Sequence, residues 1–182
     1  MYGGGNLATV GPPRNGDHDC QSTFTGATVN INSPIGINGS TYGGNVYGGS
    51  KGMPNPDTNP VQQFKKFALV SYATVNINEN ADIANGVYGG GKNGQIGLDS
   101  DDVELIHNTQ VNINGGTVRH SVYGAGEGVF GETGYTNDTI AGLIMGNSEV
   151  NLLAGTVNNV FGGGRNSVIT SRSEERFSRN AE

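Results

Sequence analysis

The residues of this chain that could do chemistry recur at a fixed place, directly after a glycine-rich step. The residue at that place is charged in four copies of the step and Asn6 in the first; the charged ones are Lys51, Lys92, Glu127 and Arg165. If the copies stack, Lys92, Glu127 and Arg165 form a column of alternating charge. Such a column is either a ladder of surface ion pairs, worth little stability per pair, or a strip that contacts an anion or an acidic sugar.

A second group of candidates lies in the acidic segment LDSDDVE, and its members are Asp99, Asp101, Asp102 and Glu104. Closely spaced carboxylates are ligands that Ca²⁺ prefers, although the segment lacks the full EF-hand pattern. A solvated acidic loop is the alternative. In a polysaccharide lyase, carboxylates of this kind would face a base on a neighbouring repeat, for which Lys92 and Arg119 are the available residues.

A third group is the run Asp17, His18, Asp19 and Cys20, a dense set of potential metal ligands inside a turn-rich connection. His107 and His120 stand apart from it, without HExxH spacing or a nucleophile motif. The single cysteine cannot form a disulfide within the chain. We therefore assign no catalytic residue, no cofactor and no metal, with Ca²⁺ at the acidic loop as the open possibility.

The glycine-rich step itself is the dominant feature of the sequence. It always follows an aromatic residue, and these anchors are Tyr2, Tyr47, Tyr88, Tyr123 and Phe161, separated by 45, 41, 35 and 38 residues. A period of this size is typical of a solenoid, a propeller or another repeat array. A column of Tyr47, Tyr88 and Tyr123 would either stack on sugars or pack at a corner of the fold.

Before each anchor from Tyr47 onward comes an alternating segment such as TVNIN, which predicts a strand with one buried face. Valine and isoleucine would point inward. The outward asparagines would form an amide ladder from one repeat to the next; they are Asn30, Asn76, Asn112 and Asn151. Strand ends rich in Asn-Gly, Glu-Asn and Ala-Gly favour positive φ at a corner.

A second strand would follow that corner and carry Ile83 and Val87 in one copy, Val118 and Val122 in the next. A third, from Gln95–Leu98 or Gly128–Gly131, would close the coil. The remaining length is assigned to three insertions: Lys51–Gln63, Asp99–Asn108 and Glu132–Ser148. These features predict an all-β fold, a parallel β-helix of about four to five coils, with a β-propeller fragment as the alternative.

Composition fits one domain, residues 1–170, as a segment of a longer array. With 32 Gly and 6 Pro the chain is turn-rich, and its net charge of −6 argues against binding to nucleic acid. No apolar stretch reaches the length of a membrane span. Residues 171–182 form a charged tail, either a polar cap on an exposed strand edge or, the interpretation we prefer, a disordered end.

The motifs YGGGNLATV, ATVNIN and GTVNNVFGGG resemble the glycine-rich repeat regions of bacterial cell-surface proteins of the adhesin-like, autotransporter-passenger-like kind. The resemblance spans about Tyr2 to Ile169 and implies a right-handed β-helix, displayed outside the cell. It implies a non-catalytic stalk or adhesin that contacts glycans or host surface proteins. A polysaccharide lyase or glycoside hydrolase on the same scaffold is the alternative, and uncapped coils would favour end-to-end self-association.

Overall fold

The computed structural model describes residues 1–5, 26–39, 43–54, 70–97, 107–139, 141–169 and 173–177. Within these ranges the chain forms strands and no helix, so the described part is all-β, as predicted. The strands are β1 (Gly26–Ile31), β2 (Val46–Tyr47), β3 (Tyr72–Ile77), β4 (Asp82–Ile83), β5 (Val87–Tyr88), β6 (His107–Tyr123), β7 (Gly146–Phe161) and β8 (Ser173–Phe177).

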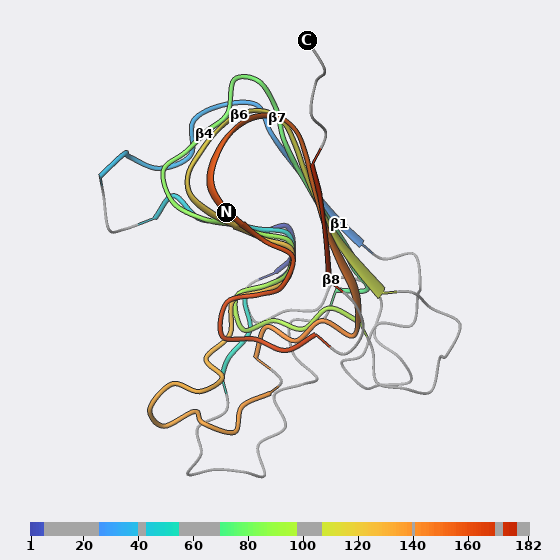
Figure 1. Ribbon diagram of the computed structural model, residues 1–182. Helices are drawn as coiled ribbons and strands as arrows, with labels where there is room; N and C mark the ends of the chain where they lie inside the picture. The colour runs from blue at the N-terminus through green and yellow to red at the C-terminus, as the bar shows by residue number, and fades with distance from the viewer. Residues whose placement is uncertain are drawn as a thin grey trace.

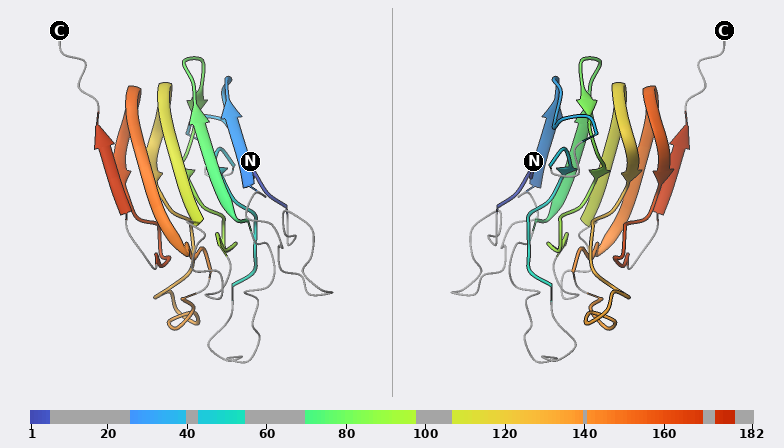
Figure 2. Two further views of the ribbon diagram at one scale, coloured as in Figure 1. Left: turned by 90° about the vertical axis from the view of Figure 1, so that its right-hand side faces the viewer. Right: turned by 90° about the vertical axis from the view of Figure 1, so that its left-hand side faces the viewer.

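These strands form one curled parallel sheet in which equivalent segments of successive repeats lie side by side. Seen along the stacking direction, the repeats follow nearly the same path (Figure 1); seen from the side, β1, β3, β6, β7 and β8 lie in chain order (Figure 2). Repeat one contains β1 and β2, repeat two contains β3 to β5, repeat three contains β6, and repeat four contains β7. Blades of a propeller are antiparallel, so the parallel pairing does not fit the propeller alternative.

The register of the sheet matches the repeat in the sequence. Val29 pairs with Val75, Val75 with Val111, and Val111 with Val150. Each of these valines is buried, as are the isoleucines two positions further on in the first three repeats. The inward valine and isoleucine columns are therefore confirmed. Burying each such side chain contributes roughly 1.5–3 kcal/mol.

A second buried cluster lies on the far side of the glycine step, where the third strand was expected. Ile96 forms single parallel bridges with Val70 and Ile144, and Ile144 forms one with Ile169. The prediction from Gln95–Leu98 is therefore correct at Ile96, while Leu98 lies outside the described residues. The corresponding prediction from Gly128–Gly131 is wrong for repeat three: Phe130 is exposed, and Ile144, beyond an intervening loop, takes the inward place.

Backbones approach closely at the glycine step, which explains its composition. The amide of Gly48 donates to the carbonyl of Tyr88, and that of Gly89 to the carbonyl of Tyr123, both at 2.9 Å. A Cβ added at Gly89 would overlap the carbonyl oxygen of Gly124. At the corner that follows the TVNIN-type segment, Gly116 and Gly155 adopt positive φ, 72° and 91°, as expected. In repeat two the same corner is formed by Glu79 and Asn80, and neither residue adopts positive φ.

The charged tail is more ordered than the preferred interpretation held. Within it, β8 pairs in parallel with Ser148–Leu152 of β7. A disordered end is therefore wrong for Ser173–Phe177, and the segment extends the sheet by one strand. The strand brings a charged sequence, SEERF, to the register positions that TVNIN-type segments occupy in the preceding repeats.

Candidate functional site

The aromatic anchors form a continuous ladder along the stacking direction. Neighbouring ring centroids lie 4.8–5.0 Å apart and the planes are within 14° of parallel. The ladder contains Tyr2, Tyr47, Tyr88, Tyr123 and Phe161. Because each inner ring is covered on both faces by its neighbours, no inner ring offers an open face to solvent.

Two of the inner rings are almost fully buried, and their hydroxyls are held by the charged column. Tyr47 is 2% exposed and Tyr88 3%. The Tyr47 hydroxyl donates a short hydrogen bond to Oε2 of Glu127. Burial raises the pKa of Tyr47, and the hydrogen bond to Glu127 raises that pKa further. Burial likewise raises the pKa of Tyr88, with the Glu127 charge as the second cause.

The charged column forms as the sequence predicts. Lys92 forms a parallel bridge with Glu127, and Glu127 with Arg165. Glu127 accepts both cations, with Lys92 Nζ 3.5 Å from Oε2 and Arg165 Nη1 3.0 Å from Oε1. Its side chain is only 14% exposed, so the centre of this ladder is less solvated than an ordinary surface ion pair. Lys51 leaves the column, because it bridges Asn93 instead of Lys92.

The outward asparagines form the predicted amide ladder. Nδ2 of each donates to Oδ1 of the one before it, from Asn76 to Asn30, Asn112 to Asn76, and Asn151 to Asn112, at 2.7–3.0 Å. A second, shorter ladder joins Asn32, Asn78 and Asn114. Stacked amides satisfy one another in this arrangement, as they do in other stacked β-structures.

Arg119 does not act as a free base. Its guanidinium holds Asp82 of the preceding repeat in a two-pronged contact, with Nε at 2.7 Å from Oδ1 and Nη2 at 2.6 Å from Oδ2. This contact lowers the pKa of Asp82, chiefly through the hydrogen bonds from Arg119. The pair is exposed and bridges two repeats on the outside of the sheet.

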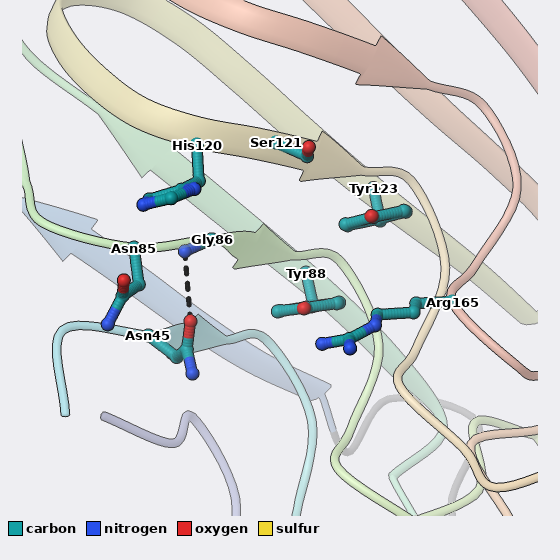
Figure 3. A pocket seen from close by; sticks show the side chains of 8 residues that line it. All are labelled: Asn45, Asn85, Gly86, Tyr88, His120, Ser121, Tyr123 and Arg165. Carbon is teal, nitrogen blue, oxygen red and sulfur yellow. Dashed lines mark hydrogen bonds between the residues drawn. The ribbon is translucent and has the colours of Figure 1, made fainter. Parts of the chain in front are cut away.

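The aromatic ladder borders an open polar groove of about 450 Å³ (Figure 3). It is lined by Asn45, Asn85, Gly86, Tyr88, His120, Ser121, Tyr123 and Arg165. Sequence reasoning named Tyr88, Tyr123 and Arg165 but missed the groove. Its other wall lies two and three positions before each anchor, where the residues are mostly polar: Asn45, Asn85, Gly86, His120 and Ser121. That offset was the available signal.

Several predicted candidates lie outside the described residues. They are the acidic-loop residues Asp99, Asp101, Asp102 and Glu104, and the N-terminal run Asp17, His18, Asp19 and Cys20. Across the described ranges, no three His, Cys, Asp or Glu side chains gather as they would around a metal ion. Nor does that part of the chain contain a helix long and apolar enough to cross a membrane.

Comparisons of the chain with protein-family models, with curated proteins and with solved structures gave no match.

Proposed function

We propose that this chain is a non-catalytic repeat module, a stalk or adhesin of a bacterial cell surface, whose polar surface contacts glycans. One observation carries the proposal: equivalent side chains in successive repeats satisfy one another. The asparagine ladder pairs amide with amide, and the aromatic ladder stacks ring on ring. Side chains that pair with their equivalents in the next repeat stabilise a long, regular stack of repeats.

The architecture that we propose for this module is a right-handed parallel β-solenoid. The in-register pairing of β1, β3, β6 and β7 supports it, together with the second buried column of Ile96, Ile144 and Ile169. Parallel strands of one sheet are connected in the right-handed sense in nearly all proteins.

An engineered disulfide tests this architecture. Asn76 and Asn112 are direct partners on β3 and β6. Strands in a sheet lie about 4.8 Å apart, within the Cα range of a disulfide. In a Cys20→Ser background, Asn76→Cys with Asn112→Cys is expected to crosslink under mild oxidation. The matched control, Asn76→Cys with Asn114→Cys, places the thiols on a diagonal and should stay reduced. The reverse pattern would disprove the register.

The non-catalytic part of the proposal rests on two carboxylates in the described part of the chain, Glu127 and Asp82. Glu127 binds Lys92, Arg165 and the Tyr47 hydroxyl, and Asp82 binds Arg119. Glycoside hydrolysis uses two carboxyl groups flanking the scissile bond, each available for proton transfer or attack. Carboxylates fixed in ion pairs between repeats serve the scaffold instead.

Incubation with acidic and neutral polysaccharides, with and without Ca²⁺, tests this point. The expected result is no change in polymer length, measured by size-exclusion chromatography, and no new reducing ends. Reproducible cleavage would overturn the proposal in favour of the lyase or hydrolase alternative. A requirement for Ca²⁺ in that cleavage would direct attention to the acidic loop.

End-to-end self-association is also part of the proposal. Beyond Leu152, the described residues provide no strand on the outer edge of β7, and Leu153 and Phe161 are 48% and 45% exposed there. An open edge with apolar side chains favours addition of another strand.

Sedimentation velocity tests this self-association. The apparent mass of the wild type should rise with concentration. Leu153→Lys should reduce that rise, and a chain that stays monomeric at all concentrations would exclude it.

A further inference from the structure

The groove beside the aromatic ladder runs across the repeats rather than along one strand. Asn45 belongs to repeat one, Asn85 and Tyr88 to repeat two, His120 and Tyr123 to repeat three, and Arg165 follows β7 of repeat four. A groove in the stacking direction meets the same ladder at intervals of 4.8–5.0 Å. This geometry suits an extended polymer with a short repeating unit.

The rings on the floor of the groove cannot stack on a sugar. Tyr88 lies between Tyr47 and Tyr123, with centroids 4.8 and 4.9 Å away, so both of its faces are covered. The rings turn an edge with its hydroxyl toward the groove, as Figure 3 shows for Tyr88 and Tyr123, and Tyr88 is only 3% exposed. Recognition in this groove therefore depends on hydrogen bonds and charge.

The wall opposite Arg165 offers polar groups that the fold does not use. In the described part of the chain, the side chains of His120 and Ser121 have no hydrogen-bond partner, and His120 is exposed. Asn45 is partly committed, because its Oδ1 accepts the amide of Gly86 at 2.9 Å. Unpartnered donors and acceptors on a concave surface are the groups that bind hydroxyls and carboxylates of a ligand.

The charge at the groove is opposite to that of the whole chain. Among the residues that line the groove, Arg165 carries a full positive charge and none is acidic; the acid that pairs with Arg165 is Glu127. The acid is 14% exposed while the Arg165 side chain is 54% exposed, so solvent meets the guanidinium rather than the carboxylate. The chain as a whole carries −6. A local excess of exposed positive charge selects an anionic ligand.

We propose that this groove binds an extended acidic polysaccharide, a polymer of uronic acids, with its carboxylates on Arg165 and its hydroxyls on His120 and Ser121. The inference rests on the proposed function and names its ligand class. Arg165 recognises the negative charge of the ligand: its Nη1 is held by Glu127, and the remaining N–H donors of the guanidinium can bind a carboxylate. His120, Ser121 and Asn45 position the chain along the ladder.

The test measures binding of polygalacturonate and of a neutral galactan to the full chain by isothermal titration calorimetry. We expect the acidic polymer to bind, the neutral polymer to bind at least about tenfold more weakly, and affinity to fall with added salt. Arg165→Gln should lower the affinity for polygalacturonate about tenfold, as expected for loss of a charged hydrogen bond. His120→Ala should lower it less.

Arg119→Gln is the matched control, because it removes the same charge from a site outside the groove and should leave the affinity unchanged. Equal binding of acidic and neutral polymers, or unchanged binding in both Arg165→Gln and His120→Ala, would overturn the inference. Absence of binding by a chain with a native circular dichroism spectrum would also overturn it while leaving the stalk function intact. Cleavage of the polymer would instead contradict the non-catalytic proposal.

Discussion

Two regions of this molecule are built from columns of polar side chains, and they use them differently. In the asparagine ladder, Asn112 donates to Asn76 and accepts from Asn151, so each inner amide is satisfied within the column. In the wall of the groove, the position three before each aromatic anchor changes from Asn85 in repeat two to His120 in repeat three. The ladder column is uniform, and every inner amide in it is paired with its neighbours. The groove column is varied: Asn85 donates to the carbonyl of Gly43, whereas the His120 side chain has no such partner among the described residues.

The difference separates construction from recognition. A residue type that recurs in every repeat is explained by the stacking itself, because identical neighbours complement one another along the column. In the groove wall the residue types change from repeat to repeat without complementary charges, so the side chains of His120 and Ser121 stay available to a ligand. We therefore expect substitutions in uniform columns to change the free energy of unfolding, and substitutions in varied columns to change binding.

The largest effect is expected at the glycine step, the most uniform column of all. Gly89→Ala places a Cβ against the carbonyl oxygen of Gly124, so neighbouring repeats must separate. Overpacking of this kind costs about 3 kcal/mol or more of unfolding free energy, measured by urea denaturation. Gly163→Ala is the matched control: nothing lies within 4 Å of its added Cβ, and the change should stay within about 0.5 kcal/mol. Equal effects at the two glycines would contradict close stacking.

The next effect is expected in the asparagine ladder. Asn112→Ala removes the partner of Asn76 Oδ1 and of Asn151 Nδ2, and should lower the free energy of unfolding by about 1–2 kcal/mol. Asn158 is a suitable control, because it makes one exposed hydrogen bond to the Arg119 carbonyl. Its substitution by alanine is expected to change stability by less than about 0.5 kcal/mol. A neutral Asn112→Ala variant would show that the ladder contributes nothing.

A smaller effect is expected from pH, through the phenols of the aromatic ladder. The pKa values of Tyr47 and Tyr88 are raised in the folded state, chiefly by burial. In the unfolded chain a tyrosine ionises near a pKa of about 10. Above that pH the unfolded state binds fewer protons than the folded state, so stability should be constant up to about pH 9 and decrease beyond about pH 10.

Urea denaturation across this range measures the decrease, and near-ultraviolet absorbance measures phenolate in the folded protein. The Tyr47→Phe variant should show a shallower decrease, since one of the two buried phenols is gone. Full ionisation of all tyrosines at pH about 10 without unfolding would contradict their burial in the ladder.

The uniform columns could be predicted from the sequence because the alternation of residue types fixes them. Val75 and Ile77 alternate with Thr74 and Asn76, and the strand period of two places them on opposite faces. The same repeat aligns Lys92, Glu127 and Arg165 directly after the glycines. Their pairing followed from the spacing alone.

The third side of the repeat and the groove could not be predicted with the same success. Phe130 comes four residues after the glycine step of repeat three, which ends at Gly126, yet Ile144 takes the inward place. Insertions of different length sit between anchor and strand, and the path of a loop does not follow from its length. The groove wall was missed for another reason: Asn45, Gly86 and Ser121 share a position before the anchor but not a residue type, so only their offset from the anchor could have indicated them.

The most direct test of the distinction between uniform and varied columns measures stability and binding together in one pair of variants, Asn112→Ala and His120→Ala. Asn112→Ala should lose about 1–2 kcal/mol of unfolding free energy and retain the wild-type affinity for polygalacturonate. His120→Ala should retain its stability within about 0.5 kcal/mol and lose affinity. The distinction is contradicted if His120→Ala lowers the free energy of unfolding as much as Asn112→Ala does. It is also contradicted if the two variants have the same affinity for polygalacturonate.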